Sequence, residues 1–373
     1  MALKIGILTL PIADNYGGIL QAVALYRYLH NQGHDVILIN KMNYLEMWKK
    51  IIVLLLEKIP KHNFKNIKTN YKKRLLWEQR KKFNKNFIET EIFKISPNLY
   101  TKEELSKYVK ENCLDAVIVG SDQVWRKTYI NDKYYKSYFL DFVDSKTTKK
   151  IAYAASFGKD YWEGKNDIED LSKLLSDFNT VSTREKSGVD ICKNSFGFNN
   201  AKHVLDPTMI MDKEFYKDLI ISKYDTSKLS KGGLLTYVLD EEDEKKEIID
   251  FVKENLKIDK VHHLKGFNSL NIIYTVPEWL ASFSNADFIV TDSFHGMVFS
   301  IIFEKDFLVI GNENRGMDRF ISLLSLLGLE DRLILDNKIS FMLKQNIDYK
   351  KVKLILEKEI EKSKEFLREA LKK

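Results

Sequence analysis

Residues 4–39 read KIGILTLPIADNYGGILQAVALYRYLHNQGHDVILI, and the order of apolar and polar residues in this stretch predicts a β-α-β unit. The apolar run at 4–10 predicts a strand, and residues 19–31 repeat apolar side chains at helical spacing. Gly33 is typical of a residue that ends a helix, and residues 36–39 predict the second strand. The chain therefore begins with two neighbouring strands of a parallel sheet.

The turn between the first strand and the helix contains Asn15-Tyr16-Gly17-Gly18. It lacks the full glycine spacing of a dinucleotide-binding fingerprint, so a dinucleotide site is not indicated. A glycine-rich turn at a helix start nevertheless leaves backbone N–H groups free to meet a phosphate or a carboxylate. Asn15, Gly17 and Gly18 are therefore predicted to bind substrate.

Further short apolar runs, each followed by polar residues, form two series along the chain. The runs lie at 116–119, 151–155, 179–182 and 203–205, and again at 234–239, 261–264, 288–290 and 307–310. Strands that alternate with helices predict parallel sheets covered on both faces. We therefore expect an α/β protein with two domains facing a cleft, at residues 1–225 and 226–345, a basic helical insertion at about 45–90 and a C-terminal helix at 346–373.

The composition excludes several classes of protein. Of the 373 residues, 44% are hydrophobic and 30% are charged, with only 5 prolines, which does not fit a disordered chain. The apolar run at 51–56 is far shorter than the ~20 residues of a membrane-spanning helix, and the N-terminus is typical of a strand, not of a signal peptide. Cys113 and Cys192 are too few for a disulfide framework or a cysteine-based zinc site. We expect a cytoplasmic protein with no bound metal ion.

The net charge of +7 is unevenly distributed. Residues 49–85 hold thirteen Lys and Arg against two acidic residues, a local charge of +11, and aromatic side chains lie among them. This pattern favours an anionic partner, either the inner face of the cell membrane through peripheral contact or a lipid-linked diphosphate. Nucleic acid is not expected, because no nucleic-acid-binding motif accompanies the segment. A solvated helix with a lysine-rich face is the alternative.

His295 is the strongest candidate for catalysis. It follows the apolar run at 288–290 and precedes a predicted helix, so it would lie at a strand end and a helix N-terminus, where anions bind. Asp292 and Ser293 are close enough in sequence to orient the imidazole or to bind a ligand. A purely structural histidine beside a glycine is the alternative.

Three arginines predict an anion-binding site. Arg315 and Arg319 follow the run at 307–310, and Arg184 follows the run at 179–182. A guanidinium group binds phosphate or carboxylate through two hydrogen bonds, so these side chains suit such a ligand. Ordinary salt bridges to the neighbouring acidic residues are the alternative.

A fourth group of polar residues, Ser121, Asp122, Gln123 and Trp125, follows the run at 116–119. Asp122 is a candidate to accept a proton or to hold a sugar hydroxyl, and Trp125 to stack on a sugar ring. Ser121 and Gln123 would complete this substrate-binding loop. A helix cap formed by Asp122 is the alternative.

Together these motifs resemble the polysaccharide pyruvyl transferase family over residues 4–335. The segments that carry the resemblance are Asn15-Tyr16-Gly17-Gly18-Ile19-Leu20-Gln21, Gly120-Ser121-Asp122-Gln123-Val124-Trp125, Ser182-Thr183-Arg184-Glu185 with Gly188, Leu205-Asp206-Pro207-Thr208, Thr291-Asp292-Ser293-Phe294-His295-Gly296, and the run from Asn314-Arg315-Gly316 to Leu327-Gly328-Leu329-Glu330-Asp331-Arg332. Each segment is short, but their order and combination are specific.

The resemblance implies two Rossmann-like domains arranged as in glycosyltransferase-B enzymes, the first on the acceptor side and the second on the donor side. It also implies ketal-forming transfer of pyruvate from phosphoenolpyruvate to a sugar of a cell-surface polysaccharide, or of its precursor, for which the basic segment favours a lipid-linked form. Phosphoenolpyruvate is then a substrate, and no cofactor is implied. The family histidine corresponds to His295, and the arginine of the family's Ser-x-Arg-Glu motif to Arg184.

One departure from the family concerns the residues before His295. Better-characterised members carry Arg-Leu-His there, whereas this chain has Ser293-Phe294-His295, so the arginine that would bind the donor phosphate is absent from that position. Arg315 or Arg319 is the predicted replacement. On this scheme His295 serves donor binding or acid catalysis, Asp122 the acceptor or the base role, and the arginines the anion.

Two other functions stay open from the sequence. A glycosyltransferase with a nucleotide-sugar donor would use the same two-domain fold in cell-envelope polysaccharide synthesis. A non-catalytic assembly protein would bind envelope-polymer precursors through residues 49–85.

Overall fold

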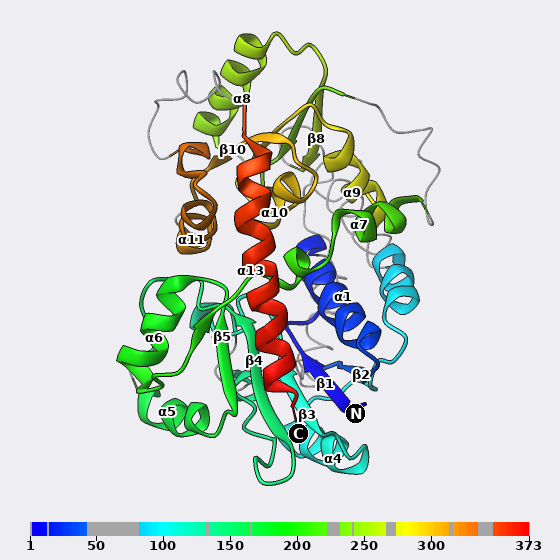
Figure 1. Ribbon diagram of the computed structural model, residues 1–373, viewed down its shortest axis with the longest axis vertical. Coiled ribbons are helices and arrows are strands. Elements are labelled where there is room, and N and C mark those ends of the chain that lie inside the picture. The colour runs from blue at the N-terminus through cyan, green and yellow to red at the C-terminus, as the bar shows by residue number, and fades with distance from the viewer. Residues whose placement is uncertain are drawn as a thin grey trace, which may run out of the picture.

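The computed structural model describes residues 2–12, 15–42, 82–130, 134–164, 166–221, 232–240, 242–265, 274–312, 316–334 and 346–372. Two parallel β-sheets organise these residues, one in the lower half of Figure 1 and one in the upper half. The predicted α/β architecture with two sheets is therefore confirmed, whereas the domain limits at 225 and 345 stay predictions.

The first sheet has six parallel strands in the order β2-β1-β3-β4-β5-β6. The strands are β1 (Lys4–Leu8), β2 (Asp35–Ile39), β3 (Ala116–Val119), β4 (Lys149–Ala155), β5 (Thr180–Thr183) and β6 (Lys202–His203). Ile5 pairs with Val36 on one side and with Ala116 on the other, which fixes the register of β1. All four residues of β3 are buried, as expected for a strand covered on both faces.

Helices pack around this sheet. They are α1 (Tyr16–Asn31), α4 (Lys102–Glu111), α5 (Ile168–Ser176) and α6 (Lys186–Phe196), with the 3-10 helices η1 (Lys127–Tyr129) and η2 (Tyr135–Phe139). Helix α1 begins at Tyr16, three residues before the predicted start at residue 19. Gly17 and Gly18 therefore lie in the first turn of α1 and not in a loop before it.

The second sheet has five parallel strands in the order β11-β10-β9-β7-β8. They are β7 (Leu234–Tyr237), β8 (Val261–Lys265), β9 (Phe288–Thr291), β10 (Asp306–Ile310) and β11 (Leu333–Ile334). The helices of this part of the chain are η3 (Pro207–Ile210), α7 (Lys213–Ile221), α8 (Asp243–Leu256), α9 (Val276–Asn285), α10 (Phe294–Ile302), α11 (Asp318–Leu327) and η6 (Glu330–Arg332). Strand β11 was not predicted.

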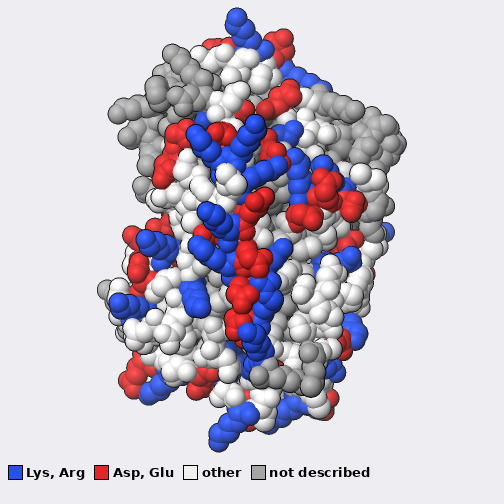
Figure 2. All heavy atoms as spheres, viewed as in Figure 1, with Lys and Arg blue, Asp and Glu red and all other residues white. Residues whose placement is uncertain are grey.

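The last helix, α13 (Tyr349–Ala370), runs from the second sheet back along the first (Figure 1). The ring of Phe366 lies 6.1 Å from that of Tyr153 on β4, and the Ser363 hydroxyl accepts a hydrogen bond from the Leu205 N–H at 3.0 Å. The outer face of α13 carries acidic and basic side chains, which form the charged stripe down the centre of Figure 2. This helix therefore joins the two halves of the molecule.

The predicted basic insertion falls mostly on residues 43–81, which lie outside the described residues. The end of the insertion is described, and residues 82–91 form a helix. No helix in the described part of the chain combines the length and apolar character needed to cross a membrane. The described residues also hold no group of three or more His, Cys, Asp or Glu arranged to bind a metal ion.

Lys41 lies just beyond the carboxyl end of β2 and is only 2% exposed. Its Nζ atom has no hydrogen-bond acceptor among the described residues and faces the rings of Tyr134 and Tyr138, whose centroids are 4.6 and 5.2 Å away. Burial lowers the pKa of Lys41 to about 8, and the charge of Asp141 offsets only part of that effect. Lys41 is thus a buried amine whose positive charge lowers the free energy of unfolding.

Lys41→Met should stabilise the protein at pH 7 by about 1–2 kcal/mol, because methionine removes the free-energy cost of the buried charge. In the wild type, the unfolded chain keeps this proton up to a pKa of 10.5 and the folded protein only up to about 8. Stability therefore rises with pH between those values in the wild type and not in the variant. Urea unfolding at several pH values should show the advantage of the variant shrinking from about pH 8 to about pH 10.

Lys150→Met is the matched control for that prediction. Lys150 is equally buried, at 2% exposed, but its Nζ lies 3.3 Å from the Asp177 carboxylate. Loss of a paired lysine should lower stability rather than raise it. A Lys41→Met protein that unfolds at lower urea than the wild type at pH 7 would argue against an uncompensated charge at Lys41.

Candidate active site

Polar residues that follow the strands of both sheets contact one another between the two halves of the molecule. Ser121 follows β3, Arg184 follows β5 and Asp206 lies three residues beyond β6, all in the first half. Phe294 and His295, at the start of α10, follow β9 in the second half. The site thus forms at the carboxyl ends of parallel strands, where α/β sheets bind ligands.

Asp206 connects these residues through a fully buried carboxylate. Its Oδ2 atom accepts hydrogen bonds from the Ser121 hydroxyl at 2.8 Å and from Nη1 of Arg184 at 2.7 Å. Its Oδ1 atom accepts from the N–H of Thr208 at 3.0 Å and from the Thr208 hydroxyl at 2.7 Å. Oδ2 also lies 3.7 Å from Nε2 of His295. One carboxylate thus holds an arginine of the first half beside a histidine of the second.

The charges around Asp206 keep it ionised. Burial by itself raises the pKa of Asp206, but the nearby His295 and Arg184 outweigh burial and hold that pKa well below its usual range. For Arg184, burial opposes the charged form, and the carboxylates of Asp206 and Asp122 more than restore it, so its pKa is raised. The Asp206–Arg184 pair is therefore charged on both sides at neutral pH.

The imidazole of His295 packs directly on the first turn of α1. A Cβ atom added to Gly17 would lie 2.0 Å from Nδ1 and 2.2 Å from Cγ of His295, so only glycine leaves room for the ring. The Ser293 hydroxyl caps α10 by accepting a hydrogen bond from the N–H of Gly296 at 3.3 Å. Nε2 of His295 has no hydrogen-bond partner among the described residues. Packing between the two halves therefore fixes the ring, with Nε2 lying 3.7 Å from the Asp206 carboxylate.

Two guanidinium groups lie over the ring of Phe294. Arg184 lies 4.5 Å and Arg319 5.2 Å from the ring centroid, and both arginines are buried. Burial, followed by the charge of Arg184, lowers the pKa of Arg319 to about 10. Both groups thus stay cationic at neutral pH, close to His295.

Arg184 does not use all its hydrogen-bond donors. Nη1 donates to Asp206, and Nη2 lies 3.6 Å from the Asp122 carboxylate. Within the described part of the chain, neither Nε nor Nη2 has a hydrogen-bond acceptor. Buried donors of this kind reduce stability unless a ligand supplies the acceptor. The geometry therefore suits an anionic ligand beside Arg184.

Two glycines bring loops of the two halves into contact next to these arginines. A Cβ atom on Gly316 would lie 2.2 Å from the carbonyl oxygen of Gly158. The turn at Gly158 is held by Glu185, whose buried carboxylate accepts hydrogen bonds from the N–H groups of Phe157 at 2.7 Å and Gly158 at 3.3 Å. Burial raises the pKa of Glu185. Glu185 thus shapes the wall of the site rather than pairing with Arg184 at the surface.

A family model described as polysaccharide pyruvyl transferase matches residues 15–314, a range that includes Arg184, Asp206 and His295. The chain belongs to the polysaccharide pyruvyl transferase family. The predicted family resemblance is thereby confirmed, and with it the prediction of a transferase.

Two of the solved structures with folds similar to this chain are of enzymes bound to a nucleotide sugar. One is the UDP-GlcNAc 2-epimerase from Neisseria meningitidis bound to UDP-GlcNAc, which is 10% identical in sequence. Its alignment covers 99% of each chain with a TM-score of 0.51. Another is UGT89C1 of Arabidopsis thaliana complexed with UDP-L-rhamnose, which is 8% identical in sequence. Its alignment covers 99% of each chain with a TM-score of 0.52. At such identities the similarity shows the fold alone, and it confirms the predicted glycosyltransferase-B-like arrangement. No curated protein matches the sequence.

Most of the predicted site residues of this pyruvyl transferase family member come together in the structure. Ser121, Asp122, Arg184, Ser293, His295 and Arg319 belong to the contacts described above, and Gly17 packs on His295. Asp122 adopts a left-handed backbone with φ of 78°, an uncommon conformation for a residue other than glycine.

Four other predicted residues are not part of these contacts. The side chain of Asn15 is exposed and makes no cap hydrogen bond to α1, and Gly18 lies beside it. Gln123 accepts a hydrogen bond from Nη1 of Arg126 at 2.8 Å. Arg315 lies outside the described residues.

Trp125 requires a correction. Its side chain is fully buried, stacks on Phe139 with ring centroids 5.1 Å apart, and donates its indole N–H to the carbonyl of Tyr138 at 2.9 Å. With its ring enclosed in an aromatic cluster, Trp125 is a core residue and does not offer a face to a sugar.

Two residues of the site were not predicted. Asp206 was part of a motif typical of the family and directly followed a predicted strand. That position could have identified it as a site residue. Phe294 also stood in a motif typical of the family, but its contacts with Arg184 and Arg319 depend on packing between the two halves.

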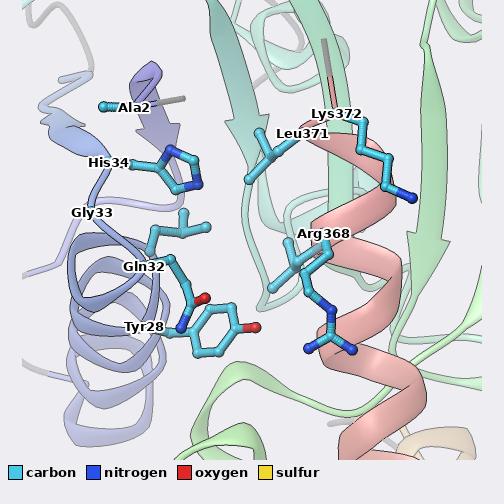
Figure 3. A pocket seen from close by; sticks show the side chains of 10 residues that line it. Ala2, Tyr28, Gln32, Gly33, His34, Arg368, Leu371 and Lys372 are labelled. Carbon is cyan, nitrogen blue, oxygen red and sulfur yellow. The ribbon is translucent and has the colours of Figure 1, made fainter.

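A pocket of about 720 Å³ lies elsewhere, between the ends of α1 and α13 (Figure 3). Tyr28 lines it from α1, Gln32 from the loop that follows α1, and Arg368 from α13. The loop at 32–34 precedes β2, so this pocket lies at the amino ends of the first sheet, whereas His295 faces the carboxyl ends. Arg368 is paired with Glu365 on its own helix. This pocket is therefore separate from the candidate active site around His295, despite its volume.

Proposed function

We propose that this protein transfers the pyruvyl group of phosphoenolpyruvate to two hydroxyls of a sugar, forming a pyruvate ketal on a cell-surface polysaccharide or its precursor. The observation that carries the proposal is the buried guanidinium of Arg184, which has N–H donors without acceptors among the described residues. Arg184 and His295 both lie next to the Oδ2 atom of Asp206. Phosphate and carboxylate groups accept such donors in pairs. Phosphoenolpyruvate carries both groups.

Arg319 supports the proposal because it supplies a second cation. Better-characterised family members are expected to have an arginine where this chain has Ser293, and Arg319 lies over the same Phe294 ring as Arg184. We infer that Arg319 takes over the role of that arginine toward the donor. Two buried guanidinium groups at one site stabilise a multiply charged anion more than a neutral sugar.

The reaction needs a proton donor and a proton acceptor. In the proposed scheme, His295 protonates the methylene carbon of phosphoenolpyruvate while a sugar hydroxyl oxygen attacks C2 of the donor. Phosphate then leaves with the electrons of its bond to C2, and a second hydroxyl closes the ketal. Of the two hydroxyl protons, one replaces the proton given by His295 and the other leaves with phosphate.

Asp122 and Asp206 have separate roles in this scheme. Asp122, 3.6 Å from Nη2 of Arg184, is assigned to accept a proton from an attacking hydroxyl. Asp206 stays ionised and holds Arg184 and His295 in place, and it does not itself transfer a proton. The products are the pyruvyl ketal and inorganic phosphate.

Product formation tests the proposal. The purified protein is incubated with phosphoenolpyruvate and a panel of methyl glycosides, and the ketal methyl group and released phosphate are followed by NMR. His295→Ala should lower the rate at least about 100-fold, because a general acid contributes that much or more. His34→Ala, at the amino ends of the first sheet, should keep the wild-type rate. Sugar transfer from a nucleotide sugar, without any ketal, would replace this proposal with the glycosyltransferase alternative.

We propose further that the acceptor is lipid-linked and that residues 49–85 contact the membrane surface. The support is the local charge of +11 with interleaved aromatic side chains. The protein should sediment with vesicles that contain phosphatidylglycerol and not with pure phosphatidylcholine vesicles. Equal recovery in the supernatant with both vesicles would rule out this contact.

A further inference from the structure

Tyr129 is an exposed aromatic residue four positions after the buried Trp125. It ends η1 and is 48% exposed. The guanidinium of Arg126 lies 4.1 Å from the centroid of its ring. Arg126 is itself held in place, since its Nη1 donates to Oε1 of Gln123 at 2.8 Å. The Tyr129 ring is therefore contacted by an oriented cation and is about half exposed.

The turn that carries Tyr129 is anchored to the loop after β4. Lys127 Nζ lies 2.6 Å from the Asp167 carboxylate. The N–H and the hydroxyl of Thr128 donate to Glu163 at 3.2 and 3.1 Å. A ring that is already oriented loses little conformational freedom when a ligand packs on it.

Contacts connect Tyr129 with the proposed active site. Gln123, which holds Arg126, directly follows Asp122 in the chain. A Cβ atom on Gly158 would lie 2.2 Å from Oε1 of Gln123 and 3.0 Å from Cδ of Arg126, and Gly158 touches Gly316 of the second half. Tyr129 is thus at the rim of the site, on the side of Asp122.

We propose that Tyr129 is the residue on which the acceptor sugar ring stacks, a role that rests on the pyruvyl transfer proposed above. The C–H face of a pyranose is apolar and packs on an aromatic ring, while its hydroxyls stay at the edge of the contact. Stacked on Tyr129, the sugar directs edge hydroxyls toward Asp122. The substrate class is therefore a pyranoside with an accessible C–H face, and Tyr129 takes the role predicted for Trp125.

Saturation-transfer NMR with methyl β-D-galactopyranoside and methyl β-D-glucopyranoside, in the presence of phosphoenolpyruvate, tests this subsite. The wild type should transfer saturation to the ring C–H protons of at least one glycoside. Tyr129→Ala should weaken that binding about five- to tenfold, the range expected for loss of an aromatic contact. Tyr129→Phe and Tyr129→Trp should retain it, because both keep an aromatic ring.

Phe93→Ala is the matched control. Phe93 is 54% exposed and carries the Arg27 guanidinium 4.9 Å from its ring centroid, but it packs on Tyr26 and His30 near the far end of α1. This variant should bind the glycoside as the wild type does. Equal binding by wild type and Tyr129→Ala, or no transfer to either glycoside, would overturn the proposal.

The affinity for phosphoenolpyruvate, measured on the same samples, separates the two proposals. Tyr129→Ala should bind phosphoenolpyruvate as tightly as the wild type does. If it does so while glycoside binding is undiminished, only the stacking role fails. If the wild type does not bind phosphoenolpyruvate, the proposed function fails, and the stacking role, which rests on it, is overturned too.

Discussion

Asp206→Asn should cost the folded protein about 3 kcal/mol and lower the transfer rate at least about 100-fold. The amide would turn an N–H₂ group toward either Arg184 or Thr208, both of which donate to Asp206 in the wild type. The buried Arg184 would also lose its hydrogen-bonded counter-charge, and His295 the negative charge 3.7 Å away. Chemical unfolding and the rate of ketal formation measure the two effects.

The pH dependence of this effect follows from the depressed pKa of Asp206. Because that pKa is well below its usual range in the folded protein, the stabilisation is complete above the unfolded value of about 4. Below about pH 4 only the unfolded chain takes up the proton, so the stability difference between wild type and Asp206→Asn should shrink. A difference that grows on acidification would show that Asp206 is not held as an anion.

Lys245→Met is a control for general destabilisation in that experiment. Lys245 is 3% exposed, and its Nζ lies 3.0 Å from the buried Asp292 carboxylate in the second half. Breaking this pair should reduce stability by a similar amount but leave the rate of ketal formation unchanged. Only Asp206→Asn should reduce both.

Gly17→Ala should abolish most of the activity while the protein stays folded. The new Cβ atom would lie 2.0 Å from Nδ1 of His295, so the imidazole must move. A displacement of about 1 Å at a catalytic group lowers rates about 100-fold. Alanine in the first turn of α1 is at the same time a better helix former than glycine, by up to about 1 kcal/mol, which offsets part of the strain.

A double-mutant cycle tests whether Gly17 acts through His295. If it does, adding Gly17→Ala to His295→Ala should cause no further loss of rate, because the group that Gly17 positions is already absent. Independent, additive losses would show that the first turn of α1 acts on the reaction in another way. Thermal unfolding of each variant checks that the proteins compared are folded.

Much of the fold was predictable because buried parallel strands are short apolar runs followed by polar residues. Strand β3 illustrates this, since all four of its residues are apolar and all four are buried. The start of α1 was not predictable in the same way. Gly17 and Gly18 are poor helix formers, and the reason for glycine at position 17, the His295 ring packed on it, does not show in a local pattern.

Only those residues of the candidate site that directly follow a strand could be predicted from the sequence. Arg184, His295 and Asp122 were predicted by that rule. Arg184 lies 3.6 Å from Asp122, and His295 lies 3.7 Å from the Asp206 carboxylate. Trp125 followed the rule and was wrong, because its ring fills the aromatic core. Phe294 contacts an arginine 110 positions earlier in the chain, and no local sequence pattern predicts such a contact.

The most direct test of the central claim is calorimetric titration of phosphoenolpyruvate into the wild type and into Arg184→Met and Arg319→Met. We expect binding to the wild type, at least about tenfold weaker binding to each variant, and no binding of UDP-, GDP- or CMP-sugars to the wild type. Folding of the variants is checked by thermal unfolding on the same samples. A wild type that binds a nucleotide sugar and not phosphoenolpyruvate would contradict the assignment of this site to pyruvyl transfer.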